Sequence, residues 1–243
     1  MRIVRKVCRK IYKAFHPAIG EVWMLHRVLP EIQRSQEKNR RDLEVTPEFL
    51  EAKILEYERK GYRFVSMDEV CNALTNASKH PFRREQPFVC ITLDDGYADN
   101  YQYAYPLFKK HDIPFVLYIT TGFVDGTAPM WWYDETPAML NWEQVRQLSR
   151  DALCTIGAHT LTHPRLGQIE QAQAQQEIKK SMQILEEKLQ IRIDHFSYPH
   201  GDYTPQVCQL VCNLGFKSSV LVWGGKVRLK QNCLEIPRVP IVM

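Results

Sequence analysis

Two adjacent carboxylates, Asp94 and Asp95, have the clearest chemical potential in the chain, because they end an apolar run over residues 88–93. The run lacks polar alternation and is rich in β-branched residues, which predicts a strand buried on both faces, as in a parallel sheet. The carboxyl end of such a strand is where α/β folds place their chemistry. Neighbouring side chains of an extended chain point to opposite sides, so one carboxylate can hold a metal while the other handles a proton. The alternative is a simple Asp-Asp-Gly turn.

A pair of histidines, His159 and His163, follows another apolar run over residues 152–156. Two imidazoles four residues apart can converge on one cation. The pair alone is a weak signal, since a single histidine is more often a satisfied polar residue. With a strand-end carboxylate it supplies the two nitrogens and one oxygen that leave a zinc-type ion open to water.

These segments resemble the motifs of the NodB-type polysaccharide deacetylases, carbohydrate esterase family 4. Residues 92–96 (TLDDG) resemble the first motif and residues 159–164 (HTLTHP) the second. Residues 197–201 (SYPHG) are similar to the third motif in the poly-N-acetylglucosamine deacetylase branch. The resemblance runs from about Glu21 to the C-terminus.

The resemblance implies a reaction and a role for each motif residue. The reaction is hydrolysis of N-acetyl groups on N-acetylhexosamine units of a polysaccharide or lipid-linked saccharide, releasing acetate, with a divalent metal expected to be Zn²⁺. The implied roles are general base for Asp94, metal ligands for Asp95, His159 and His163, and oxyanion or substrate contacts around His200 and Tyr198.

Two features depart from the family pattern. Many relatives carry an arginine at the start of the third motif, paired with the catalytic carboxylate, where this chain has Ser197. The usual C-terminal histidine is also absent from residues 236–243. His26 follows the apolar run 22–25 and resembles the N-terminal histidine motif of the circularly permuted poly-N-acetylglucosamine deacetylase branch. Since the first and last strands of a barrel are neighbours, we predict His26 as the general acid, suited by an ordinary pKa near 6.5; a structural strand-end histidine is the alternative.

Aromatic residues follow the strand predicted at 114–119. Trp131 and Trp132 lie in the loop after it, where their faces could stack on sugar rings. An equally open alternative is that they anchor the loop to the core.

Strand and helix patterns alternate along the chain, which implies parallel strands with crossover helices. About seven such units predict an α/β fold, a distorted or incomplete (β/α)7 barrel of the NodB-like type. The stretch 29–45 is predicted to be an irregular surface loop, and the Gln- and Glu-rich helix at 168–189, with an exposed polar face, is assigned no function. The predicted helices span residues 47–60, 66–74, 100–111, 141–150, 168–189 and 204–214.

Length and composition favour one globular domain. The chain has 243 residues, of which 44% are hydrophobic, and no apolar run reaches the roughly 18 residues of a membrane span. The N-terminus lacks the apolar core of a secretory signal. Seven cysteines without a CxxC pair favour a reduced, cytoplasmic setting.

Charge is unevenly distributed. Six of the 32 basic residues precede Glu21, the first acid, which leaves 26 basic against 28 acidic residues in the rest, so the body is not a nucleic-acid binder on charge grounds. As a helix, residues 1–15 would have one basic and one apolar face. This arm could contact an anionic membrane at its inner face or dock on its own domain. We therefore divide the chain into an arm, 1–16, and a deacetylase domain, 17–243.

Two other functions stay open. The fold could hydrolyse a different amide, or it could be an inactive sugar-binding pseudoenzyme. The four polar groups at Asp94, Asp95, His159 and His163 weigh against a pure binding module, which has no need of them in one place.

Overall fold

The computed structural model describes residues 18–75 and 86–243. The predicted N-terminal arm lies outside these residues, so its contact with an anionic membrane stays a prediction. Among the described residues, no helix is both long and apolar enough to cross a bilayer.

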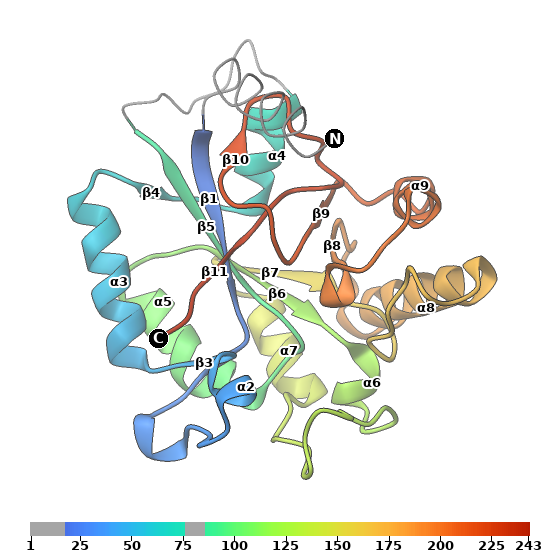
Figure 1. The fold of residues 1–243 in the computed structure, drawn as a ribbon, viewed down its shortest axis with the longest axis horizontal. Coiled ribbons are helices and arrows are strands. Elements are labelled where there is room, and N and C mark those ends of the chain that lie inside the picture. Colours follow the sequence, from blue (N-terminus) through green and yellow to red (C-terminus); the bar gives the residue numbers. More distant parts are fainter. Residues whose placement is uncertain (1–17, 76–85) are drawn as a thin grey trace, which may run out of the picture.

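A curved parallel sheet forms the centre of the fold (Figure 1). Ile236 makes a parallel bridge to Val220, and the short strand β11 (Val239–Pro240) pairs in parallel with the first strand. The C-terminal segment thus spans the gap between the last strand and the first, which gives the incomplete (β/α)7 barrel that the sequence predicts. The six main strands, in spatial and chain order, are β1 (Ala18–Leu25), β5 (Phe88–Leu93), β6 (Phe115–Ile119), β7 (Cys154–Ala158), β8 (His195–Ser197) and β9 (Ser218–Val220).

Short strands pair with the starts of two main strands. β10 (Val227–Arg228) runs antiparallel to the start of β1, and β4 (Arg63–Phe64) runs parallel to the start of β5. A separate parallel pair joins β2 (Arg27–Val28) to β3 (Glu44–Val45).

The segment 29–45 is more ordered than predicted. It contains a 3-10 turn, η1 (Glu31–Gln33), and a short helix, α2 (Lys38–Arg41). Arg34 and Glu44 are buried within it: the Arg34 guanidinium donates to the Glu44 carbonyl (3.0 Å), and the Ser35 N–H donates to the Glu44 carboxylate (2.7 Å). A charged stretch is therefore ordered here because its charges are hydrogen-bonded inside the segment.

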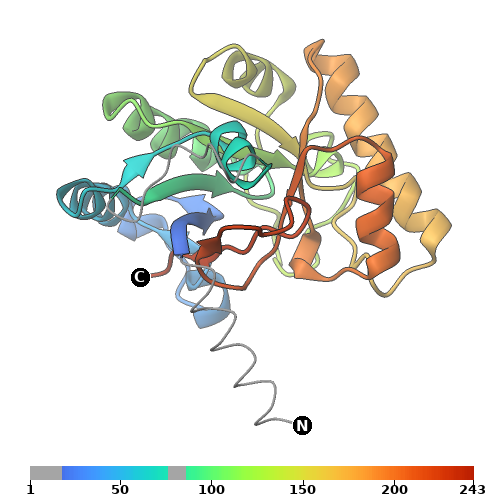
Figure 2. The ribbon, with the colours of Figure 1, turned by 90° about the horizontal axis from the view of Figure 1, so that it is seen from above.

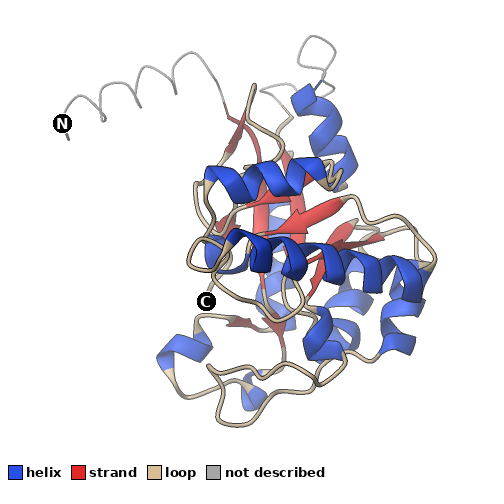
Figure 3. Ribbon diagram, turned by 90° about the vertical axis from the view of Figure 1, so that its right-hand side faces the viewer, coloured by secondary structure: helices blue, strands red, loops and turns tan. Residues whose placement is uncertain are grey.

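Helices surround the sheet (Figure 3), and α8 and α9 pack against each other (Figure 2). All six predicted helices form, with local caps as their signal: the Thr46 hydroxyl accepts from the Phe49 N–H (3.1 Å), and Asn141 and Gln144 form a capping box. The longer helices are α3 (Pro47–Arg59), α4 (Met67–Thr75), α5 (Tyr105–Lys110), α7 (Trp142–Ser149), α8 (Gln171–Leu189) and α9 (Pro205–Asn213). Shorter ones are the π-helix η2 (Asn100–Ala104), α6 (Thr121–Val124) and the 3-10 turn η3 (Pro199–Gly201).

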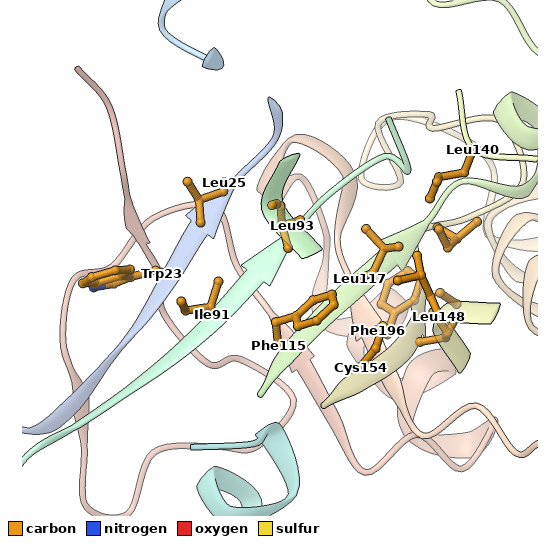
Figure 4. Packing of buried hydrophobic residues seen from close by; sticks show 14 of the residues in the cluster. Trp23, Leu25, Ile91, Leu93, Phe115, Leu117, Leu140, Leu148, Cys154 and Phe196 are labelled. Carbon is orange, nitrogen blue, oxygen red and sulfur yellow. The ribbon is translucent and has the colours of Figure 1, made fainter. Parts of the chain in front are cut away.

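Strand side chains alternate between two hydrophobic layers. On β5, Ile91 and Leu93 belong to the larger layer, which also contains residues of the outer helices (Figure 4). Phe88 and Cys90 belong to the second, which α4 helps to close. By the same alternation, Asp94 continues the row of Phe88 and Cys90, on the inner side of the barrel.

Candidate active site

Polar side chains gather where the parallel strands end. Leu25 of β1 pairs with Leu93 of β5, and the Leu25 carbonyl accepts a hydrogen bond from the Asp94 N–H (3.0 Å). His26 and Asp94 are therefore the next residues on adjacent strands, and His159 follows directly after β7. These ends border a cavity of about 820 Å³. Its titratable lining includes His26, Asp94, Asp95, His159, His163 and His200.

Asp95, His159 and His163 converge as predicted, with one donor atom from each lying within 4.8 Å of the other two. Asp95 Oδ1 lies 3.5 Å from His159 Nε2 and 3.4 Å from His163 Nε2. This oxygen is buried and has no hydrogen-bond partner among the described residues. Since buried polar atoms are normally paired, a cation held by this oxygen and the two ring nitrogens fits the residues present.

The protonation of the two imidazoles suits such a cation. His159 Nδ1 lies 2.8 Å from the Ser197 carbonyl, so this nitrogen carries the proton and Nε2 presents a lone pair to the cluster. Burial lowers the pKa of His159 to about 4 and places the pKa of His163 well below its usual value. Burial, together with the Asp94 charge, raises the pKa of Asp95 to about 8. A positive ion in the cluster would favour the neutral imidazoles of His159 and His163. It would also offset the raised pKa of Asp95, so that this carboxylate is ionised when the ion is bound.

The loops around the cavity have an uncommon backbone conformation. Asp95, Thr160, His163 and His200 have φ angles of 75°, 68°, 62° and 59°. Non-glycine residues adopt this left-handed region only where their surroundings compensate for the cost, and such residues concentrate at functional sites. Four of them around one cavity support a site in which side-chain direction is tightly controlled.

Asp94 is held by Arg238, a partner that the sequence analysis did not identify. Arg238 Nη1 donates to Asp94 Oδ1 (2.7 Å) and Nη2 to Oδ2 (2.6 Å), and both side chains are buried. The same guanidinium donates to the Thr92 hydroxyl (3.0 Å) and the Leu221 carbonyl (2.7 Å). Burial acts to raise the pKa of Asp94, but the Arg238 charge and hydrogen bonds, together with His159 and His26, outweigh burial and the pKa falls to about 2. The arginine missing from position 197 is thus supplied by the C-terminal segment.

His26 lines the cavity beside Asp94, since each follows directly after one of two paired strands. Burial lowers its pKa to about 4, although the Asp94 carboxylate acts in the opposite direction. The expected pKa near 6.5 is therefore wrong. The imidazole is neutral at pH 7 and can act as an acid only after it takes up a proton during the reaction.

Three tryptophans and His200 form the outer lining of the cavity. Trp131 is 70% exposed, and the Trp132 ring centroid lies 5.0 Å from that of His163. Trp223, which is 67% exposed, was not predicted, and its only signal is a lone tryptophan before two glycines. The His200 ring lies 4.5 Å from the His163 ring, so this residue sits against a ligand of the cluster.

Tyr198 does not line the cavity, which corrects its expected contact with substrate. Its ring is buried and stacks on Tyr203 at 4.5 Å, and its hydroxyl donates to the Leu234 carbonyl (3.2 Å). Adjacent residues of an extended chain face opposite sides. Ser197 Oγ therefore meets Arg238 (3.2 Å) inside the barrel, while Tyr198 packs in the outer core.

Comparison with known proteins agrees with this geometry. The polysaccharide deacetylase family model matches residues 83–219. YxkH of Bacillus subtilis (strain 168), assigned by name to the polysaccharide deacetylases, is 25% identical over 181 residues, or 74% of this chain and 60% of YxkH. The chain thus matches less than two thirds of that relative's length.

Solved structures show the same fold. The Streptococcus pyogenes deacetylase PplD, in complex with acetate, has a TM-score of 0.78 and 25% identity, with 92% of each chain covered. IcaB from Ammonifex degensii has a TM-score of 0.76 and 23% identity, over 93% of this chain and 92% of IcaB. On the family match and the shared architecture, the chain belongs to the polysaccharide deacetylase family.

Proposed function

We propose that this protein hydrolyses N-acetyl groups on N-acetylhexosamine units of a polysaccharide or lipid-linked saccharide. The observation that carries the proposal is the convergence, in one cavity, of the Asp95, His159 and His163 cluster with Asp94 and His26. Amide hydrolysis at neutral pH needs a polarising centre, a group that accepts a proton from water and a group that protonates the leaving amine. The cavity contains a candidate for each task.

Asp95, His159 and His163 would hold the divalent ion. We propose Zn²⁺, because two imidazoles and one carboxylate form a common catalytic zinc site with an open position. A bound ion of this kind supplies Lewis-acid polarisation of the acetyl carbonyl and makes water more acidic.

Asp94 is the proposed proton acceptor. Its pKa of about 2 keeps it ionised at working pH, and the two-point contact with Arg238 fixes both carboxylate oxygens. The attacking water gives a proton to Asp94 as its oxygen bonds to the acetyl carbon. The proton that Asp94 took from water passes to the more basic His26. When the C–N bond breaks, the amine nitrogen takes this proton from His26, and the acetyl group leaves as acetic acid, which ionises to acetate.

The cavity lining supports a saccharide as the substrate. Exposed tryptophans at positions 131 and 223 present flat apolar faces beside the polar floor, and amphipathic faces of this kind suit sugar rings. We also propose that residues 1–15, with their six basic side chains, contact an anionic membrane, which would suit a lipid-linked substrate.

Acetate release on a panel of N-acetylated saccharides tests the function. The panel contains N-acetylglucosamine, its short oligomers and its polymer, with the fully deacetylated oligomers as matched controls. We expect acetate and free amine in equal amounts from at least one N-acetylated member. Hydrolysis of a different amide without acetate release would favour the alternative amidohydrolase, and saccharide binding without hydrolysis would favour a pseudoenzyme.

A further inference from the structure

Glu177 on α8 is a buried carboxylate among core residues. It is 8% exposed, and its neighbours on the buried face of the helix include Ala174 and Ile178. A charged group in such surroundings is costly unless it is fully hydrogen-bonded. Its contacts therefore indicate why this glutamate occupies a position in the core.

Among the described residues, the hydrogen bonds of Glu177 all go to the loop between the two histidines of the cluster. Glu177 Oε2 accepts from the N–H groups of Leu161 (3.1 Å) and Thr162 (2.8 Å). Glu177 Oε1 accepts from the Thr162 hydroxyl (2.8 Å). Hydrogen bonds to an ionised acceptor are roughly twice as strong as neutral ones. The carboxylate thus binds the loop at three points.

The opposite side of this loop is held by the start of α6. The Thr121 N–H donates to the Thr160 carbonyl (3.3 Å), and the Gly122 N–H donates to the Leu161 carbonyl (2.8 Å). A Cβ at Gly122 would lie 2.5 Å from that carbonyl oxygen, so only glycine permits the approach. Glu177 accepts hydrogen bonds from the N–H groups of the loop, and the N–H groups of α6 donate to its carbonyls. The loop is therefore held from two sides.

The clamped loop contains two non-glycine residues in the left-handed backbone region, which is costly unless the surrounding contacts compensate. Thr160 and His163 have φ angles of 68° and 62°, and the His163 N–H donates to the Thr160 hydroxyl (3.0 Å). We propose that Glu177 is a positioning residue for the metal site, which holds this loop so that His163 Nε2 stays beside Asp95. The inference rests on the metal site of the proposed function. Glu177 does not line the cavity, so it acts through the loop and not on the substrate.

Zinc affinity of the full-length protein tests this role. The dissociation constant for Zn²⁺ is measured by competition with a chromophoric chelator for the wild type, Glu177→Ala and Glu177→Gln. We expect Glu177→Ala to weaken Zn²⁺ binding by about tenfold or more, as loss of a residue that orients a metal ligand does. Glu177→Gln should weaken it less, because the amide oxygen still accepts backbone N–H groups and the amide nitrogen can donate to the Thr162 hydroxyl.

The same helix offers a matched control. Glu186 Oε1 accepts from the Ile193 N–H (3.2 Å), a similar bond to a loop that does not carry the histidines. Glu186→Ala should leave the Zn²⁺ affinity unchanged, and the visible spectrum of Co²⁺-loaded protein should change in Glu177→Ala only.

Several outcomes would overturn the proposal. A folded Glu177→Ala protein with wild-type affinity and Co²⁺ spectrum would do so, as would an equal loss in Glu186→Ala. Should Glu177→Ala not fold, Glu177→Gln replaces it, and wild-type affinity and spectrum there would count against the proposal. A wild type that binds no Zn²⁺ would instead contradict the proposed function, so the two failures are distinct.

Discussion

Arg238 and Asp94 lie 144 residues apart in the chain and form a buried two-point ion pair, with N–O distances of 2.7 and 2.6 Å. Arg238 belongs to the segment that bridges to β9 at Ile236 and pairs with β1 at Val239. The segment that completes the barrel therefore also fixes the proposed base. Closure of the barrel and the position of the Asp94 carboxylate are therefore coupled through the Arg238–Asp94 pair.

Replacing Arg238 with methionine should destabilise the protein strongly, because Asp94 then becomes an unpaired buried charge. We expect the free energy of unfolding at pH 7, measured by urea denaturation, to fall by about 3–5 kcal/mol. Arg165→Met is the matched control, since Arg165 is 47% exposed and lies 3.7 Å from Asp202. Such a surface pair contributes about 0–1 kcal/mol. Equal losses in the two variants would refute a special role for Arg238.

The stability deficit of Arg238→Met should shrink as the pH falls. In the wild type, the folded pKa of Asp94, about 2, lies below its ordinary 3.8, so the group stabilises the fold above about pH 4 and loses this effect toward pH 2. Without Arg238, burial raises that pKa above its ordinary value, and the ionised group then favours unfolding. Urea denaturation at about pH 7 and about pH 5 should show a smaller deficit at the lower pH. An identical deficit at both would mean that Asp94 is not the group affected.

Asp94→Asn should retain zinc but lose turnover, because the amide keeps the shape of the side chain and cannot accept the proton from water. General-base loss typically lowers the rate by about 10²–10⁴. Elemental analysis and acetate release measured on one preparation separate the two effects. Asp125→Asn, which alters a carboxylate bonded to the Trp142 indole N–H (2.6 Å) outside the cavity, is the control. Near wild-type turnover in Asp94→Asn would place the base elsewhere.

His26→Ala should keep the fold and the metal but lower kcat by about two orders of magnitude or more. The loss should be smaller for an acetate ester with a good leaving group, which needs no proton on departure. His111→Ala changes a histidine beside Glu51 (2.8 Å), outside the cavity, and should have no effect on kcat. If His26→Ala deacetylates at the wild-type rate, the permuted general acid is wrong. His200, which also lines the cavity, then becomes the next candidate for the general acid. His195 does not line the cavity, and its Nδ1 is hydrogen-bonded to the Ser218 hydroxyl (2.9 Å).

The parts of the site that the sequence predicts are those with a local signal. An uninterrupted apolar run leads to Asp94 and Asp95, and another apolar run comes shortly before His159, with His163 four residues later. Helix starts such as Thr46 and Asn141 have capping residues that act within one turn. Local chemistry therefore predicts where each element begins and which ends carry polar groups.

The parts that the sequence does not predict depend on contacts between distant segments. Arg238 has no local pattern beyond a lone arginine in an apolar run, and its partner is set by closure of the barrel. Glu177 lies in a Gln- and Glu-rich helix whose composition indicates an exposed face, and nothing in that helix reveals that a distant loop needs an acceptor. The expected contact of Tyr198 with substrate is wrong because its neighbour Ser197 faces the inside of the barrel. Which of two neighbouring residues faces inward depends on the strand register.

Whether hydrolysis depends on the metal at Asp95, His159 and His163 is tested by acetate release from the wild type before zinc removal, after removal by a chelator, and after zinc is restored. His159→Ala/His163→Ala is treated in parallel. We expect wild-type release on an N-acetylglucosamine oligomer to be lost with the metal and regained with about one equivalent of Zn²⁺, while the double variant neither binds the ion nor regains activity. Full acetate release by metal-free wild type, or full zinc content in the double variant, would contradict this expectation.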